Sequence, residues 1–360
     1  DIKAHETPRA YSYASRYLRD MLQNTNSVDR AVATAKSFFF IKYLGLMLKT
    51  ATLNLSQNVV SGLPELSIHT KGAAGKYLKE SGKYLSELAG YSANLQGDIP
   101  KSLYKKNPEL AKVLEELFAE GVTQDVFMQE IQGRMGGAQR RLWNNFVKLM
   151  GYPMSVAEKF NRASLAAAAF KAARDGKIVN AKTLERLGMK AGEKATYEQA
   201  KKFATIVVKN AHFVYGKSNY PEAFRGSDTK KVLSTGYTFR TFSHNLLNFW
   251  YNAIKQDRGG QAIVRSISSV AVLGGLSSLP LYGLLMTLSR TLTGEDPEEE
   301  YRSLIDSHIW RDIVTYGVPS IGGTQIGSSM GMEIPGLLEI AESRSGWDVI
   351  TSIIGVPASV

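Results

Sequence analysis

The side chains that usually carry catalysis do not stand in a catalytic pattern. The chain of 360 residues has no cysteine, which excludes thiolate nucleophiles, thiolate metal sites and disulfide frameworks. Its five histidines are scattered, with no H-E-x-x-H or other close pairing that would ligate zinc. Walker and Rossmann glycine patterns are missing, so nothing supports nucleotide binding. We therefore predict no catalytic residue, no cofactor and no bound metal.

One segment of the chain matches a catalytic motif. Residues 327–331 read Gly-Ser-Ser-Met-Gly and fit G-x-S-x-G, which in hydrolases is a strained turn between a strand and a helix. No apolar strand precedes this segment, and Glu333 and Pro335 follow where a long helix should begin. We interpret the match as chance and the protein as non-enzymatic.

Two pairs of adjacent cations, each followed by an aromatic residue, are candidates for phosphate contact. Such pairs can hold the phosphate of a single strand while a base stacks on the ring. On a helix they also serve as the solvent edge of an aromatic core, and both interpretations stay open. The candidate phosphate contacts are Arg140, Arg141, Lys230 and Lys231.

Charge is divided unevenly along the chain. The total is 44 basic and 33 acidic residues, a net charge of +11. Residues 261–360 contain no lysine, five arginines and eleven carboxylates, which leaves that stretch at −6 and residues 1–260 at +17. A basic body attracts nucleic acid or an anionic lipid surface without sequence specificity. The alternative is an ordinary solvated surface rich in lysine.

Helical signals recur along the chain and nothing of comparable length alternates with period two, so we predict an all-α fold. Asn107 and Pro108 are typical of a helix start, and Ser155 with Glu158 forms a capping box. Asp296 and Pro297 open a third helix, with three glutamates in its first turn. The predicted helices cover 107–121, 155–174, 196–212, 228–257 and 296–317, with a buried stripe in the last.

The predicted helix over 228–257 carries large side chains at three- and four-residue steps. This heptad-like spacing is typical of a helix that packs against another along one seam. The candidate seam residues are Phe239, Phe242, Leu246, Phe249 and Ala253.

Residues 266–289 are 24 positions without a formal charge. As a helix they would span roughly 36 Å, enough to cross a bilayer core. Gly274, Gly275 and Pro280 interrupt the stretch, which predicts an apolar helical hairpin near the C-terminus, either inserted into a membrane or partner or buried in a protein core. The candidate inserting residues are Ile267, Val270, Val272, Leu273, Leu276, Leu279, Leu281, Leu284, Leu285 and Leu288.

A second uncharged run covers residues 313–332. Gly323, Gly327 and Gly331 stand four residues apart in it, the small-residue spacing of close helix contact. Pro319 and the density of glycine make a loop an equal alternative.

These patterns divide the chain into three regions. We predict a basic helical region over 1–150, a helical region with the aromatic seam over 151–260, and an acidic, lysine-free apolar region over 261–360. No basic and apolar signal segment precedes Asp1, so we expect an excised or processed piece of a longer product. The helices are expected to form an elongated or bundle-like assembly.

Several sequence blocks, in one order, resemble the C-terminal region of the large polyvalent proteins of bacteriophages and conjugative elements, the PLxRFG-type group. Residues 280–281 (Pro-Leu) are followed by Tyr-Gly-Leu-Leu, so the motif that names the group is not present. The similarity extends over about residues 50 to 340. Its blocks are 54–57, 62–66, 157–162, 212–215 through Asn219 and Pro221, 238–240 to Trp250 and Tyr251, the apolar hairpin, the acidic helix at Asp296, and 327–332 before Pro335.

The resemblance implies an internal virion protein that is packaged in the capsid and ejected with the genome. Such a protein is implied to be helical and homo-oligomeric, to contact portal or core proteins, and to line a conduit across the host envelope. Its location would be the virion interior and then the host cell envelope. DNA, contacted without sequence specificity, and a membrane are further candidate partners. Two other hypotheses stay open: a membrane-inserting pore-former or toxin whose inserting element is 266–289, and the anchoring segment of a giant virion enzyme such as a packaged RNA polymerase.

Overall fold

The computed structural model of the chain describes residues 14, 17–18, 26–44, 48–82, 85–94, 98–126, 138–213, 220–221, 224–279 and 282–322. Within these ranges the secondary structure is helical, with one isolated antiparallel bridge between Thr70 and Ile178 and no strand. The predicted all-α class is therefore confirmed.

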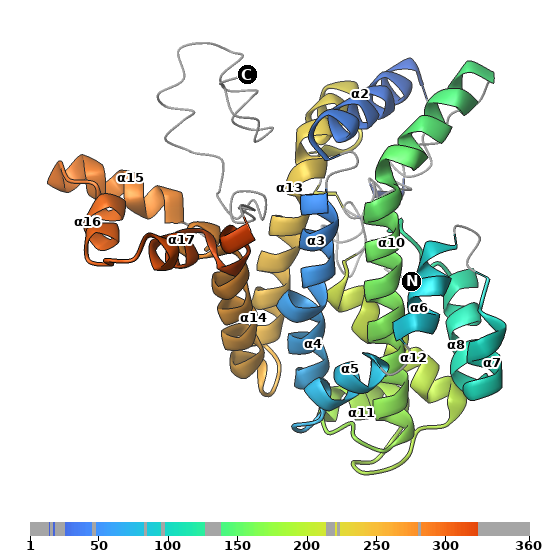
Figure 1. Cartoon of the computed structure of the whole chain (residues 1–360). Helices are drawn as coiled ribbons and strands as arrows, with labels where there is room; N and C mark the ends of the chain where they lie inside the picture. Colours follow the sequence, from blue (N-terminus) through green and yellow to red (C-terminus); the bar gives the residue numbers. More distant parts are fainter. Residues whose placement is uncertain are drawn as a thin grey trace, which may run out of the picture.

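The helices are labelled as in Figure 1. The first group comprises α2 (Ser27–Leu44), α3 (Leu48–Gln57), the π-helical turn η1 (Asn58–Gly62), α4 (Leu63–His69), α5 (Ala74–Ser81), α6 (Leu85–Ala93), α7 (Lys101–Lys106) and α8 (Pro108–Ala119). The second comprises α10 (Ala138–Arg174), α11 (Ala181–Leu187), α12 (Tyr197–Ala211), α13 (Asp228–Ile254) and α14 (Gly259–Gly274). The last comprises η5 (Leu276–Ser278), α15 (Tyr282–Thr293), α16 (Pro297–Ser303), α17 (His308–Tyr316) and η6 (Val318–Gly322).

Helix α10, 37 residues long, is the centre of the body, with α3, α5, α6 and α12 packed around it (Figure 1). Ala166, Ala167, Ala168 and Ala169 are all buried, and their small side chains let neighbouring helices approach closely. Large side chains such as Phe203 of α12 complete the same buried cluster. The core of the body therefore lies around the C-terminal half of α10.

The course of α10 differs from the prediction at its start. The helix does not open at Ser155 but runs on from Ala138 with Pro153 inside it. The Ser155 hydroxyl donates to Asp125 (2.5 Å) instead of capping a helix. The boundary predicted at residue 150 falls within α10, and α2 packs on α13.

Three helices have the predicted cap or extent, because their signals are local. The Asn107 side chain accepts a hydrogen bond from the Leu110 amide (3.0 Å) at the start of α8. Thr196 and Gln199 form a reciprocal capping box at the start of α12. Helix α13 begins at Asp228 as expected.

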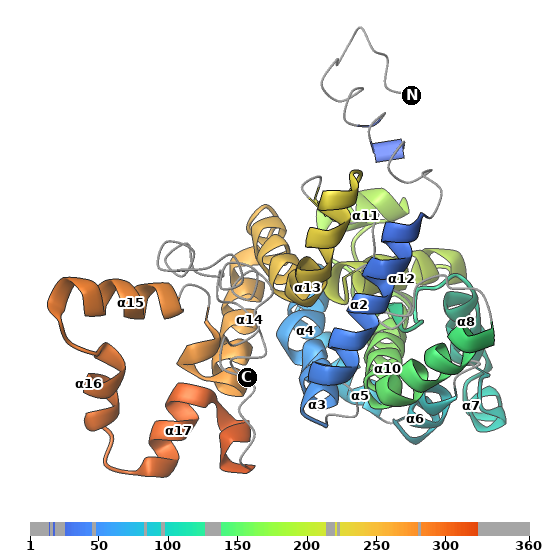
Figure 2. The same ribbon diagram turned by 90° about the horizontal axis from the view of Figure 1, so that it is seen from above.

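Beyond α14 the chain leaves the body as an arm formed by α15, α16 and α17, which Figures 1 and 2 show projecting to one side. Among the described residues α17, rather than α15, packs against the end of α14, which argues against the predicted apolar hairpin. Gly275, with φ +69° and ψ −172°, makes this crossing possible: a Cβ on it would lie 2.3 Å from the Thr315 carbonyl carbon. None of the described helices combines the length and the apolar composition needed to cross a bilayer.

The predicted helix over 296–317 is broken in two, as α16 and α17. The Asp296 carboxylate caps α16 by accepting from the Glu298 amide (3.0 Å) and pairs with Arg290 (2.6 Å). Leu304, between the two helices, is 81 % exposed, and Ile309 on α17 is 49 % exposed, although both belong to the predicted stripe. The stripe predicted to be buried is therefore partly open to solvent.

Candidate functional site

The most concentrated polar chemistry lies inside the body, on α10. Arg162 and Glu158, one turn apart, form an ion pair (3.0 Å) in which each side chain is only 2 % exposed. The Arg162 guanidinium also donates to the carbonyl oxygens of His212 (2.7 Å) and Phe213 (2.9 Å), directly after α12. A buried guanidinium thus fixes α10 to the end of α12.

Lys159, the next residue of α10, is buried as well. Its ammonium group donates to the carbonyl oxygen of Asn94 (3.2 Å), just beyond α6. Burial lowers the pKa of this ammonium group, while the charges of Asp125 and Glu158 favour its protonated form. One turn of α10 therefore carries three buried charged side chains, of which Arg162 binds the end of α12 and Lys159 binds the residue after α6.

The π-helical turn η1 joins this network. The side-chain amide of Asn58 donates through Nδ2 to the carbonyl oxygen of Asn161 (3.2 Å) and to the Ser164 hydroxyl (2.9 Å). Its Oδ1 lies 2.8 Å from Nε2 of His212. A Cβ at Gly62 would lie 2.8 Å from the same Oδ1, so glycine leaves room for the network. Single π turns are rare and usually mark a position under a special constraint.

The imidazole of His212 is buried, and its Nδ1 has no hydrogen-bond partner among the described residues. Burial, and then the charge of Arg162, hold the pKa of His212 well below the ordinary 6.5. In the unfolded chain this imidazole takes up a proton below about pH 6.5, so the unfolded state binds one more proton. The free energy of unfolding is therefore expected to fall by about 1.4 kcal/mol for each pH unit below that value.

Urea denaturation of the wild type and of His212→Gln between about pH 7.5 and pH 5 measures this loss. The other titrating groups are common to both proteins, so the difference between the two slopes reports His212. Equal slopes would contradict the burial of a neutral imidazole.

A second buried cluster has the outline of a hydroxyl–imidazole–carboxylate triad. The Thr183 hydroxyl lies 2.8 Å from Nδ1 of His69, and Nε2 of His69 lies 3.0 Å from Glu65. The same hydroxyl is 3.0 Å from the Asn180 side chain that caps α11, and Glu65 also accepts from Asn210 (2.7 Å). All three side chains of the triad are buried, so the cluster joins α4, α11 and α12 and presents no accessible nucleophile.

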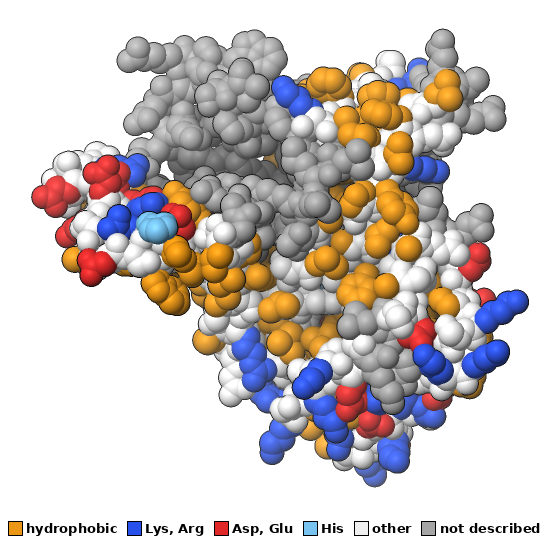
Figure 3. Space-filling model, viewed as in Figure 1, with side chains coloured by type: hydrophobic (Ala, Val, Ile, Leu, Met, Phe, Trp, Pro, Cys, Tyr) orange, Lys and Arg blue, Asp and Glu red, His pale blue; other side chains and the backbone are white. Residues whose placement is uncertain are grey.

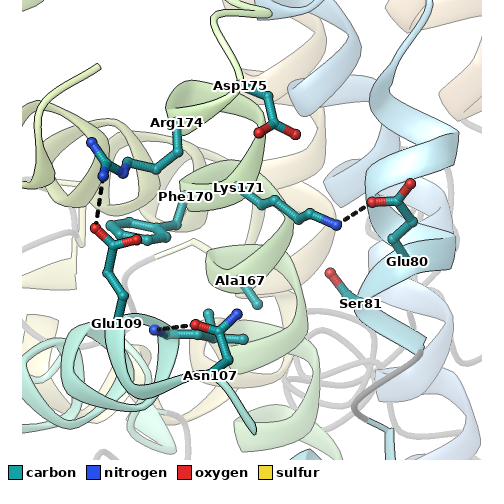
Figure 4. A pocket seen from close by; sticks show the side chains of 10 residues that line it. Glu80, Ser81, Asn107, Glu109, Ala167, Phe170, Lys171, Arg174 and Asp175 are labelled. Atoms are coloured by element: carbon teal, nitrogen blue, oxygen red, sulfur yellow. Dashed lines mark hydrogen bonds and ion pairs between the residues drawn. The ribbon is translucent and has the colours of Figure 1, made fainter. Parts of the chain in front are cut away.

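A cavity of about 160 Å³ opens beside α10, α5 and the start of α8 (Figure 4). Lys171 pairs with Glu80, Arg174 pairs with Glu109 (3.0 Å), and Phe170 contributes an apolar wall. The hydrogen bond from Lys171 lowers the pKa of Glu80. The volume of the cavity is enough for a small polar solute. Both cations that line it are already paired with a carboxylate. No group of three His, Asp or Glu side chains suited to a metal ion occurs in the described part of the chain.

The predicted aromatic seam lies between α13 and its neighbours. Leu246 and Phe249 belong to a buried cluster with residues of η1 and α14, and Ala253 packs with α4. The Phe242 ring contacts that of Phe213 at a centroid distance of 6.0 Å. The Phe239 side chain lies outside the described part of the structure.

The predicted inserting residues are separated rather than brought together. Val270 is buried in the body, whereas Ile267 and Val272 on the same helix are exposed. Leu273, Leu276 and Leu279 are half-buried around the break at Gly275. The remaining candidates lie outside the described side chains: Leu281, Leu284, Leu285 and Leu288.

The predicted phosphate contacts have different positions. Lys231 is buried, with its ammonium group 3.0 Å from Asp29 and 3.2 Å from Asp228, so it joins α2 to α13 instead of reaching the surface as predicted. Lys230 is half-buried on the same helix. The side chains of Arg140 and Arg141, and the glycines at 323, 327 and 331, lie outside the described part.

Uncovered apolar area lies on α14, where Ile267 and Val272 were predicted as inserting residues, and on the arm, where α17 was not among the candidates. Hydrophobic side chains gather over α14 and α17 in Figure 3. On α14, Val264, Ile267 and Val272 are exposed, while Ala262 and Val270 face the core. The signal was present in the sequence, because a helix that is apolar on both faces is typical of one with a second neighbour.

Comparisons with known proteins identify no relative. No family model matches the chain, and no curated protein or solved structure matches it significantly. Any function of the chain must therefore be argued from its own core and surface.

Proposed function

We propose that this protein is a non-enzymatic structural protein of a bacteriophage particle. It is packaged in the capsid and delivered with the genome, and it helps to form a conduit across the host envelope. In this role it assembles with further copies or with portal or core proteins, and its basic body contacts packaged DNA without sequence specificity. The anchoring of a giant virion enzyme is a variant of the same role.

The observation that carries the proposal is the projecting arm with its uncovered apolar side chains. Monomeric proteins rarely expose contiguous apolar area of this kind, and larger patches mark contacts with other macromolecules. The arm is acidic and the body is basic, so the chain has two chemically different surfaces.

The core supports the same proposal. Three of the blocks that resemble the phage proteins meet in one buried network around α10. Asn161 donates to Asn54, Arg162 donates to the His212 carbonyl oxygen, and Gln57 donates to the Ala211 carbonyl oxygen (3.3 Å). Sequence blocks that lie far apart along the chain therefore act as one structural unit.

The test uses particles from the bacterium that carries this reading frame. We expect the chain to be present by mass spectrometry in purified particles, resistant to protease while the capsid is closed and digested after the capsid is opened. After infection, a fraction is expected to sediment with the host envelope. Absence from particles, or digestion on intact particles, would contradict the proposal.

A pore-forming or toxin-like protein is the second candidate, favoured by the exposed apolar face of α14. It makes a different prediction, because the purified protein alone would then raise the conductance of a planar bilayer. Conductance without particle association would replace the first proposal by the second.

A further inference from the structure

Four exposed lysines from separate segments gather at the end of the body where α4, α10 and α13 terminate. Lys71 and Lys177 adjoin the bridge that pairs Thr70 with Ile178. The ammonium group of Lys182 lies 3.2 Å from the carbonyl oxygen of Lys255. Lys71, Lys177, Lys182 and Lys255 are exposed, and none of them is a member of an ion pair among the described residues. We call the four lysines the cationic end.

Neighbouring contacts hold the cationic end together. The Arg258 guanidinium donates to the Thr70 carbonyl oxygen (3.0 Å), which fixes the turn after α13 against the turn after α4. Asp257 is the one carboxylate on the turn between α13 and α14. Figure 3 shows the same excess of Lys and Arg over Asp and Glu at the lower end of the molecule.

Apolar side chains accompany these charges. Ile254 is 70 % exposed and Tyr251 is 61 % exposed, and the Lys255 ammonium group lies 3.7 Å from the centroid of the Tyr251 ring. A phosphate backbone would engage the lysines and leave this apolar area uncovered. A protein surface with both carboxylates and apolar side chains would cover the whole patch.

The arm has that composition. Glu295, Glu299, Glu300 and Asp306 are exposed and form no ion pair within the described part of the chain. The exposed side chains of α17 and of the segment before it supply the apolar area. Over residues 282–322 the arm has seven carboxylates and three arginines.

One copy cannot satisfy both surfaces by itself. The cationic end includes the turn before α14, and the arm begins after α14, so this helix separates them. Its 16 residues are about 24 Å long. The complementary surfaces therefore face different directions on one molecule.

We propose that copies of this chain associate head to tail, with the acidic arm of one copy docked on the cationic end of the next. The inference rests on the proposed function, because it names the partner and the interface of the projecting arm. Contacts between unlike surfaces close into a ring or continue as a helical filament. The acidity of the arm opposes binding to nucleic acid or anionic lipid and favours a basic protein surface.

Charge reversal with rescue tests the interface. The cationic-end variant is K71E/K182E/K255E, and the arm variant is E295K/E299K/E300K. At about 50 mM salt we expect the average molecular mass of the wild type, measured by sedimentation velocity, to rise with protein concentration. At about 500 mM salt we expect it to return to the mass of the monomer. Each variant alone is expected to associate at least about tenfold more weakly, and an equimolar mixture to recover association with 1:1 composition.

The control K101E/K105E/K148E makes the same change in net charge at exposed lysines away from the cationic end, and we expect it to assemble like the wild type. Circular dichroism verifies that each variant is folded. A monomeric wild type, a mixture that does not associate, or an arm variant that fails while the cationic-end variant assembles would each overturn the interface. If the wild type does not self-associate but binds duplex DNA, and K71E/K182E/K255E abolishes that binding, the cationic end is a DNA-binding surface instead. A monomer protected inside particles would overturn this interface and leave the proposed function standing.

Discussion

Replacing Arg162 by alanine is expected to lower the free energy of unfolding by about 3–5 kcal/mol. The substitution removes the ion pair that Arg162 forms with the buried Glu158 carboxylate, and it removes the donor of two carbonyl oxygens after α12. Equilibrium unfolding in urea, followed by far-UV circular dichroism at neutral pH, measures the loss.

Two further variants decide whether charge or packing is responsible. Lys148→Ala, an exposed position on the same helix, is expected to change the unfolding free energy by less than about 0.5 kcal/mol. The double substitution Arg162→Met with Glu158→Leu removes both charges and is expected to be more stable than Arg162→Ala. A loss below about 1 kcal/mol in Arg162→Ala would show that the guanidinium does not hold α10 and α12 together.

Replacing Gly275 by alanine is expected to release α17 from α14. The backbone there occupies a region that only glycine enters easily, which costs other residues about 1–3 kcal/mol. The added Cβ would also overlap the carbonyl carbon and oxygen of Thr315. These are backbone atoms, so a change of side-chain rotamer cannot relieve the overlap. Hydrogen exchange should report amides of α17 exchanging at least about tenfold faster, while those of α10 stay protected.

Gly188→Ala is the matched control. Gly188 also has a positive φ, of +65°, but a Cβ there would meet nothing within 4 Å. Its substitution is expected to cost only backbone strain and to leave exchange in α17 unchanged. Equal effects of the two substitutions on α17 would mean that the close approach at Thr315 does not hold the arm.

Helix starts and apolar seams could be predicted from the sequence because their causes are local. Asn107 caps α8 through an amide three residues away, and the spacing of Leu246 and Phe249 predicts which face of α13 packs. The break of the apolar stretch has a distant cause. Gly275 faces Thr315, which is forty positions further along the chain, and no local pattern reports that contact.

The burial of charged side chains could not be predicted from the sequence either, because it also depends on contacts between distant segments. In the sequence Lys231 resembles a surface cation in a polar stretch. In the structure it is buried, because its ammonium group pairs with Asp29, 202 positions away. The cationic end likewise needs three turns to meet, and each turn alone carries only an ordinary number of lysines. Charge composition predicted a basic body, and tertiary packing decided which lysines are available.

The pairing of α2 with α13 delays the completion of the fold during synthesis. α2 is among the first described helices to leave the ribosome, but its polar contacts at Asn26 and Asp29 await residues 228 and 231. Contacts between distant segments slow folding, because the intervening chain must be ordered before they form. Helix α10 is made earlier and contacts α2 through Val147, but the face of α2 that packs on α13 stays uncovered until α13 emerges, and an early partner would find its binding surface there.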